Sequence, residues 1–276
     1  MYAGFDVYAY DVEPKKQAAI ATLGARAAPT IADIAQKCPT LVLCVFDTRQ
    51  VEQVVEESGG IAQTLRETSE TRDLICASTC DPDRLAALAA RTEAQGMRFL
   101  EMPISGSSGQ VAEGHGLGLI GGSRELMERL APFLEALCPR RHYLGPLGNA
   151  SRAKLAINLI LGLNRAALAE GLVLAARLGL DPQAFLEVAR DSAAYSQAMD
   201  VKGPAMTRRE FRPAQGRIDQ SLKDFRLMLE QARARGQRLP FASVYVEMLE
   251  DCVQHGEGEW DNAAILEAIG RMASAL

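Results

Sequence analysis

The stretch "LGPLGNASRAKLAINLILG" (144–162) divides the sequence into two halves of different character. Gly145 and Pro146 begin a tight turn, and the apolar residues that follow it predict a long helix. Short apolar runs alternate with helical stretches before this segment, whereas only amphipathic helical patterns follow it. We therefore expect an α/β domain over residues 1–146 and an all-helical domain over residues 147–276, beginning with a long interdomain helix.

Four apolar runs in the first half predict strands, and the residues between them predict helices. The runs are "TLVLCVF" (40–46), "DLICAST" (73–79), "RFLEMPI" (98–104) and "LGLIGG" (117–122), and a helix is expected over 123–137. The first two runs lack strict alternation, which is typical of strands that are buried on both faces of a parallel sheet. Repeated strand–helix units of this kind predict a doubly wound α/β sheet.

The formal net charge of −5 provides no electrostatic footprint for a nucleic acid, so no nucleic-acid partner is expected. Six cysteines occur without the spacing of a zinc site, and no metal is expected. Cys44 and Cys76 lie inside apolar runs and are predicted to be buried free thiols. Reduced cysteines and the lack of a signal-peptide pattern favour a cytoplasmic protein.

The longest apolar run, residues 155–180, is interrupted by polar and charged residues such as Asn158, Arg165 and Glu170. It is therefore interpreted as a buried helix and not as a membrane span, and no membrane partner is expected.

Lys154 and Asn158 lie one turn apart on the same face of the predicted long helix. A lysine near the electropositive start of a helix has its ammonium form destabilised, and burial would lower its pKa further. Such a lysine can exchange a proton with a substrate hydroxyl near neutral pH, and Asn158 can orient the same substrate. The alternative for this motif by itself is a surface lysine beside a polar neighbour.

Three other segments carry polar groups where ligands bind to open α/β sheets. Small residues from Ser105 to Gly109 follow a predicted strand, and their amides and hydroxyls suit a carboxylate, although a simple glycine-containing loop has the same pattern. Thr79 also follows a strand, where hydroxyls often cap the next helix instead. Lys223 precedes an aspartate in a predicted helix, and such a pair is often only a solvated ion pair.

The segment "FDVYAYD" (5–11) predicts a strand that ends at Asp11, followed by a helix over about 13–23. In dinucleotide-binding sheets an acidic residue at this place holds the adenosine ribose, about twenty residues after a glycine-rich turn. Only ten residues precede Asp11, and Gly4 is the sole glycine among them.

Four segments together resemble signature regions of the β-hydroxyacid dehydrogenases, the family of 3-hydroxyisobutyrate and L-threonate dehydrogenases. They are "MPISGSSGQVAEG" (102–114), "GPLGNASRAKLAIN" (145–158), "SLKD" (221–224) and "GEGEWDNAAI" (256–265). The resemblance runs from residue 1 to the C-terminus. It implies a Rossmann-like NAD(P)-binding domain, followed by a helical domain like that of 6-phosphogluconate dehydrogenases.

The resemblance also implies a role for individual residues. Lys154 would be the catalytic acid/base and Asn158 a substrate-orienting residue, while Ser105, Gly106 and Ser107 would hold the carboxylate of the substrate. Thr79 would lie beside the nicotinamide, Lys223 would reach the cofactor or substrate, and Asp11 would bind the ribose diol, which favours NAD over NADP.

The expected reaction is hydride transfer between the nicotinamide cofactor and a small 3-hydroxy acid or its semialdehyde or keto form. A homodimer or homotetramer is expected. Four residues depart from the family pattern and leave the substrate open: Glu101 replaces the usual Asp, Ser107 and Ala150 each replace a glycine, and Ile157 replaces an asparagine.

If Asp11 ends the second strand of the sheet, the first strand and the glycine-rich loop are expected upstream of Met1. Two alternatives to the dehydrogenase remain at this point. An imine reductase shares the architecture but generally lacks the catalytic lysine. A catalytically silent subunit or binding protein would explain the missing loop, and saturable NADH binding would distinguish it from an enzyme.

Overall fold

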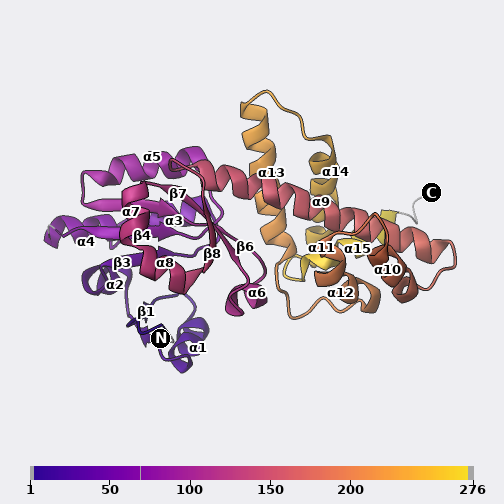
Figure 1. Ribbon diagram of the computed structural model, residues 1–276, viewed down its shortest axis with the longest axis horizontal. Coiled ribbons are helices and arrows are strands. Elements are labelled where there is room, and N and C mark those ends of the chain that lie inside the picture. The colour runs from indigo at the N-terminus through magenta and orange to yellow at the C-terminus, as the bar shows by residue number, and fades with distance from the viewer. Residues whose placement is uncertain (1–2, 69, 273–276) are drawn as a thin grey trace. The chain divides into compact units, whose positions relative to one another are not determined.

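The computed structural model describes residues 3–68 and 70–272 of the chain (Figure 1). It consists of two compact units, one containing the residues up to Gly106 and Gln110–Lys154, the other Ser107–Gly109 and the residues from Leu155 on. Among the described residues, the strands lie in the first unit and the second unit is helical. The predicted fold class, an α/β Rossmann-like domain followed by a helical domain, is confirmed.

The first unit contains short strands separated by helices. The strands are β1 (Tyr8–Ala9), β2 (Arg26–Ala27), β3 (Thr40–Leu43), β4 (Arg72–Cys76), β5 (Met97–Glu101), β6 (Ile104–Ser105), β7 (Leu117–Gly122) and β8 (Arg140–Tyr143). The helices are α1 (Pro14–Thr22), α2 (Ile31–Lys37), α3 (Thr48–Glu56), α4 (Ile61–Thr68), α5 (Pro82–Glu93), α6 (Ser108–Ala112, whose first two residues belong to the second unit), α7 (Arg124–Arg129) and α8 (Ala131–Leu137).

The strands form two sheets. β1 and β2 pair in parallel, and β3, β4 and β5 form the parallel part of a six-stranded sheet. β7 is antiparallel to both β5 and β6, and β8 is parallel to β7, so the larger sheet is mixed rather than purely parallel. The reversal has a physical reason, because only the short segment between β6 and β7 joins them, and a parallel crossover needs a dozen or more residues.

β5 and β6 act as one interrupted strand along β7. Leu100 is opposite Gly122 and Ile104 is opposite Gly118, so both strands keep the same register. The interruption falls at Pro103, which has no backbone N–H to donate to the ladder. Pro103 still accepts a hydrogen bond from Leu119 N (3.1 Å), so the chain stays on the edge of β7 and brings β6 to the position of the predicted substrate loop.

Burial of the parallel strands follows their place in the sheet. All five residues of β4 are buried between its neighbours β3 and β5, as predicted for a strand covered on both faces. β3 is different, because it is the end strand of the larger sheet among the described residues and exposes Val42. The prediction that Cys44 is buried is therefore wrong, since this thiol follows β3 on the same exposed side, whereas Cys76 in β4 is buried.

The helix predicted over 123–137 is two helices. Leu130 ends α7 and precedes α8, whose first turn contains Pro132. Because a proline lacks an N–H and clashes with the preceding turn, it interrupts a helix unless it lies in the first turn. The strand predicted over 5–11 is also shorter than expected and is reduced to β1.

The second unit is a helical bundle. Its elements are α9 (Asn149–Arg177, which begins in the first unit), α10 (Pro182–Asp191), α11 (Gln197–Val201), α12 (Gly203–Arg208), α13 (Ile218–Ala234), α14 (Pro240–Gln254), the 3-10 helix η1 (Asn262–Ala264) and α15 (Ile265–Met272). Buried residues of all these elements form one core, with Phe225 of α13 packed edge-to-face on Tyr245 of α14.

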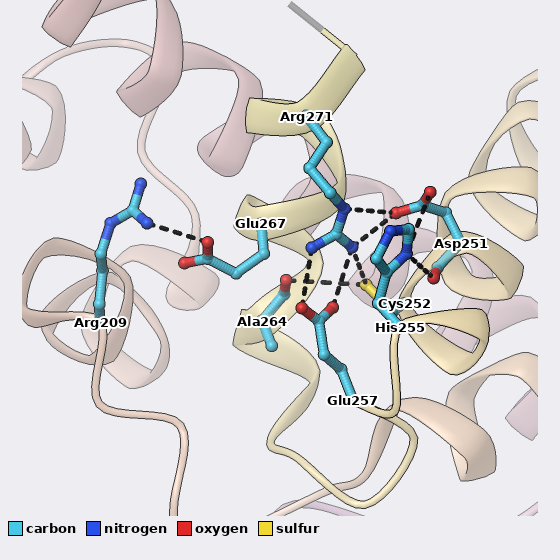
Figure 2. A network of polar contacts seen from close by, with 8 residues as sticks. All are labelled: Arg209, Asp251, Cys252, His255, Glu257, Ala264, Glu267 and Arg271. Carbon is cyan, nitrogen blue, oxygen red and sulfur yellow. Dashed lines mark hydrogen bonds and ion pairs between the residues drawn. The ribbon is translucent and has the colours of Figure 1, made fainter. Parts of the chain in front are cut away.

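Arg271 fastens the last helix to the helix before it (Figure 2). Its Nε donates to Asp251 Oδ2 of α14 (2.8 Å), and its Nη1 donates to Glu257 Oε1 in the loop that follows (2.8 Å). Charge-assisted bonds of this kind are among the stronger polar contacts of proteins. They hold α15 against the loop that contains "GEGEWDN" (256–262).

Of the described helices, α9 is long and apolar enough to cross a membrane, judged by length and composition alone. One face of it explains this composition without a membrane, because Leu155, Leu168 and Leu172 are buried in the core of the second unit. Only a third of its most apolar window is buried, however.

Candidate active site

The loops after β3 and β4 are fastened to each other at the carboxyl edge of the sheet. Ser78 Oγ accepts from Val45 N and donates to Val45 O, both at 2.8 Å. Asp81 N donates to Thr48 Oγ1 (2.9 Å), three residues further along each loop. Thr79 lies half-buried between these two fastenings. Thr79 therefore lies beyond the carboxyl end of β4, the edge of the sheet at which ligands of open α/β sheets generally bind.

Lys154 lies in the second turn of α9 and is only 7% exposed. Its Nζ donates to the backbone oxygen of Ile104 (2.7 Å), which directly precedes Ser105. The structure therefore brings the predicted acid/base to the start of the predicted substrate loop, fifty residues away in the sequence.

The loop after β6 depends on a glycine. Gly106 has a φ of +142°, a conformation that L side chains rarely adopt, and a Cβ there would lie 3.4 Å from Gly116 Cα. Ser105 is the last residue of β6, and Ser107 directly follows the glycine. The turn thus combines the exposed backbone of Gly106 with two half-buried serines in a short segment, which is the composition of an anion-binding loop.

Glu101 fixes the start of the helix that carries Lys154. Its side chain is completely buried, and its carboxylate accepts from Ala150 N (2.9 Å), Ser151 N (3.0 Å) and the hydroxyl of Ser151. A carboxylate at a helix N-terminus satisfies free N–H groups and complements the helix dipole. Gly121 makes room for it, because a Cβ there would overlap the carboxylate.

In the second unit, Asn158 is part of a second polar cluster. Its Nδ2 donates to Asp224 Oδ2 (3.1 Å), and Lys223 Nζ pairs with Asp224 Oδ1 at 2.8 Å. Asp224 is buried and Lys223 half-buried, so this lysine is not part of a fully solvated ion pair. The amide nitrogen of Asn158 faces Asp224, which leaves the amide oxygen to face a donor.

Family models match both halves of the chain. Residues 1–145 match the NAD binding domain of 6-phosphogluconate dehydrogenase, and residues 148–269 match the NAD-binding domain of NADP-dependent 3-hydroxyisobutyrate dehydrogenase. The chain belongs to the β-hydroxyacid dehydrogenase family.

Relatives from plants and bacteria resemble this family member over nearly its whole length. The chain is 28% identical to glyoxylate/succinic semialdehyde reductase 2 of Arabidopsis thaliana, over 97% of this chain and 74% of the relative. It is 27% identical to L-threonate dehydrogenase of Cupriavidus necator, over 96% and 88%. The crystal structure of 3-hydroxyisobutyrate dehydrogenase from Salmonella typhimurium has a TM-score of 0.87 with 26% identity, over 96% of this chain and 92% of that chain.

The chain is therefore an NAD(P)-dependent oxidoreductase of the hydroxyacid dehydrogenase class, and its first half is an NAD(P)-binding domain. The residues at the carboxyl edge fit such a cofactor, because parallel strands end there beside the half-buried hydroxyl of Thr79. No group of three or more metal-ligating side chains exists among residues 3–68 and 70–272.

Asp11 lies two residues after the end of β1, whereas the predicted strand ended at Asp11 itself, and it precedes α1, which begins at Pro14. Its Oδ1 accepts from Glu13 N (2.9 Å), and Gln17 of α1 donates to its backbone oxygen. One carboxylate oxygen of Asp11 therefore accepts a hydrogen bond within a local turn, and the residue is half-buried.

One stretch of this β-hydroxyacid dehydrogenase has the GxGxxG spacing of a phosphate loop, at residues 116–121. It forms β7 and not a strand-to-helix turn, so it does not present its amides to a phosphate. Its glycines instead admit buried neighbours, since a Cβ on Gly118 would lie 3.3 Å from Met102 and from Cys138.

Sequence reasoning missed the roles of two residues, Glu101 in the first unit and Asp224 in the second. The sequence marks Glu101 only as a departure from the family pattern, and its signal is an acid at the end of a buried strand. It marks Asp224 only as the neighbour of Lys223, and the contact of Asp224 with Asn158 depends on the packing of α9 against α13, which no local pattern reveals.

Proposed function

We propose that the protein transfers a hydride between a nicotinamide cofactor and a small 3-hydroxy acid or its semialdehyde or keto form, with Lys154 as the acid/base. One observation carries this proposal: a buried lysine donates a hydrogen bond to the backbone just ahead of the Ser105–Gly106 turn. Catalytic acids and bases are commonly found in such partly desolvated places. The names of the relatives support the substrate class.

In this proposal, Ser105, Gly106 and Ser107 bind the carboxylate of the substrate through backbone N–H groups and hydroxyls. This places the carbonyl carbon near the cofactor and the carbonyl oxygen within reach of Lys154 Nζ. Asn158, oriented by Asp224, contacts the same substrate, and Thr79 contacts the nicotinamide. Lys223 contacts the cofactor or substrate from α13.

When bound, the cofactor supplies or accepts the hydride, and the protein supplies orientation and proton transfer. In the reducing direction, Lys154 donates a proton from Nζ to the carbonyl oxygen as the carbon gains the hydride. In the oxidising direction, neutral Lys154 accepts the proton of the hydroxyl. General acid–base catalysis by one residue is typically worth about 10²–10⁴-fold in rate.

We propose NAD rather than NADP as the preferred cofactor. Asp11 follows β1 with its side chain half-buried, and a carboxylate at the adenosine ribose favours the diol and repels a 2′-phosphate. The preference is tested by comparing kcat/KM for NADH and NADPH in the protein and in Asp11→Ser, where the ratio should move toward NADPH.

We also propose a domain organisation, an oligomeric state and a location for this enzyme. Residues 1–146 bind the cofactor, residues 147–276 form the helical domain, and the enzyme works as a homo-oligomer in the cytoplasm. A catalytically silent role is not favoured, because the chain keeps the lysine, the serine–glycine turn and the asparagine that this chemistry needs.

The central experiment is steady-state reduction of a panel of small semialdehydes by Lys154→Met, with Arg152→Met as a matched control. Arg152 is an exposed basic residue of the same helix, two positions away. We expect Lys154→Met to lose about 10²–10⁴-fold in kcat while NADH binding, measured by fluorescence titration, is retained. Activity of Lys154→Met equal to that of Arg152→Met would overturn the role of Lys154.

A further inference from the structure

A cavity lies in the helical hairpin formed by α13 and α14. Its volume is about 370 Å³, within the range of about 300–1,000 Å³ that is typical of small-molecule sites in proteins. Its apolar wall consists of Leu229, Leu239 and Pro240, and its polar lining includes Arg233, Arg238 and Ser243. We call it the hairpin cavity.

The guanidinium groups of Arg233 and Arg238 make no hydrogen bond or ion pair with the residues that the structure describes. Arg235 is different, because its Nη1 donates to Gln231 Oε1 (2.7 Å) and to the backbone oxygen of the same residue (3.1 Å). Arg235 does not line the cavity. Of the arginines at residues 231–240, those with unused side-chain donors are therefore the two that line the cavity.

The positive charge of the hairpin cavity comes from side chains rather than from helix ends. α13 ends and α14 begins beside it, so the negative end of one helix dipole offsets the positive end of the other. Arg233 lies in the last turn of α13, where a cation is favoured, but this position leaves its N–H donors unused. Among the described residues that line the cavity, none is acidic. Two uncompensated positive charges thus lie beside an apolar wall.

An anion with an apolar portion matches this lining. The planar guanidinium group of arginine presents two parallel N–H donors, which fit the oxygens of a carboxylate or a phosphate. Two such groups suit two negative charges, and the apolar wall suits a hydrocarbon or aromatic portion. We propose that the hairpin cavity binds a small organic dianion, either a phosphate monoester or a dicarboxylate with an apolar portion, between Arg233 and Arg238.

This ligand is separate from the substrate and cofactor of the proposed reaction. Lys223 lies ten residues before Arg233 on the same helix, which corresponds to about 15 Å along the axis of α13. Binding in the hairpin cavity therefore does not depend on the role proposed for Lys154.

An anionic membrane surface is the other partner that arginines beside apolar side chains can meet. Phe241, in the first turn of α14, is 76% exposed and is available to such a surface. A bilayer, however, contacts side chains that protrude, whereas Arg233 and Arg238 line a cavity. The cavity therefore favours a small ligand over a membrane.

Isothermal titration calorimetry on the full chain tests this proposal, with phenyl phosphate and benzylmalonate as probes. We expect saturable binding of at least one probe, and weaker binding of inorganic phosphate, which has no apolar portion. Arg233→Gln and Arg238→Gln should each weaken binding about tenfold or more, because each removes charge-assisted hydrogen bonds. Arg235→Gln is the matched control, since it removes the same charge from an exposed residue outside the cavity, and should leave binding unchanged.

The probe that loses affinity in Arg233→Gln and Arg238→Gln identifies the ligand as a phosphate monoester or as a dicarboxylate. The absence of saturable binding for both probes would overturn the proposal, and so would inorganic phosphate that binds as tightly as either probe. Equal affinities in Arg233→Gln, Arg238→Gln and Arg235→Gln would also overturn it, because the probes would then bind elsewhere on the protein. Co-flotation with phosphatidylserine vesicles that all three variants weaken equally would overturn it too and assign the arginines to a membrane surface.

Discussion

Asn158 donates its amide hydrogen to Asp224, so the residue proposed to orient the substrate is itself oriented by a buried carboxylate (3.1 Å). Asp224 also pairs with Lys223 at 2.8 Å. One acid therefore holds two of the proposed site residues, and the orientation of the Asn158 amide depends on its remaining charged.

Asp224→Asn should lower kcat/KM about tenfold or more, because a hydrogen bond to a charged group is worth about 1.5–3 kcal/mol and the neutral amide can be turned either way. Steady-state kinetics measure this effect. The control is Glu230→Gln, an exposed acid on the same helix, which should leave the kinetics unchanged. Equal kcat/KM for the two variants would mean that Asp224 has no role in positioning.

Patterns of sequence predicted the elements that depend on local hydrophobicity. The runs 40–46 and 73–79 contain most of β3 and β4, and the break after Gly145 precedes α9. These predictions succeed because a buried strand must be apolar and a helix must begin after a turn. Hydrophobic patterns predict the length of an element less well, and the strand predicted over 5–11 is only Tyr8–Ala9 in the structure.

The features that were not predicted depend on neighbours distant in sequence. The exposure of Cys44 depends on β3 being an end strand, and the antiparallel direction of β7 depends on how its connection to β6 is routed. Glu101 caps α9 across fifty residues of sequence, and although an acid at the end of a buried strand is unusual, the sequence does not show which N–H groups it contacts. Sequence patterns therefore located Lys154, whereas what holds its helix required the structure.

Glu101→Gln should destabilise the protein by about 1–2 kcal/mol and also lower activity. The amide NH₂ group of the variant would face N–H donors of Ala150 and Ser151, which need an acceptor. Because these bonds fix the first turn of α9, the position of Lys154 changes with them. Urea denaturation and steady-state kinetics measure the two effects.

Ser123→Ala is the control that distinguishes an effect on protein stability from an effect on the position of Lys154. Ser123 caps α7 by accepting from Leu126 N, so this variant also loses a helix cap. We expect it to lose stability with unchanged kcat/KM. If Glu101→Gln also keeps its kcat/KM, Glu101 contributes to folding only.

The thiols should differ sharply in reactivity. Burial and the neighbouring Glu257 raise the pKa of Cys252 to about 12, and Figure 2 shows its sulfur next to the Arg271 guanidinium. At pH 8 only about one in ten thousand Cys252 side chains is then a thiolate, the reactive form. Cys44 is exposed. Iodoacetamide should therefore label Cys44 in the native protein and leave Cys252 unlabelled, as measured by peptide mass spectrometry.

Labelling after unfolding in urea is the control, and both thiols should then react. Native labelling of Cys252 at the rate of Cys44 would contradict the buried position of the Cys252 thiol beside Arg271.

Lys202 and Asp261 form an ion pair inside the helical unit, at 8% and 4% exposure, with Nζ 2.9 Å from both carboxylate oxygens. Asp261 also accepts from Gln215 N and Ala263 N. Lys202→Met should destabilise the protein by about 3–5 kcal/mol, because it leaves a buried carboxylate without its counter-charge. Urea denaturation at neutral pH measures this loss, and Lys202→Met/Asp261→Asn should recover part of it. A double variant less stable than the single one would contradict this account.

The same pair predicts how stability depends on pH. Burial alone would raise the pKa of Asp261, but Lys202 and the surrounding N–H groups outweigh it and hold this pKa below its ordinary value. A carboxyl with a lowered folded-state pKa contributes stability above its unfolded pKa of about 3.9, and the contribution is lost as the pH falls through the lower folded value. The stability difference between the protein and Asp261→Asn should therefore be constant from neutral pH down to about 5 and shrink below about 4. A difference that is the same at neutral pH and at about pH 3 by urea denaturation would show that Asp261 does not carry this acid sensitivity.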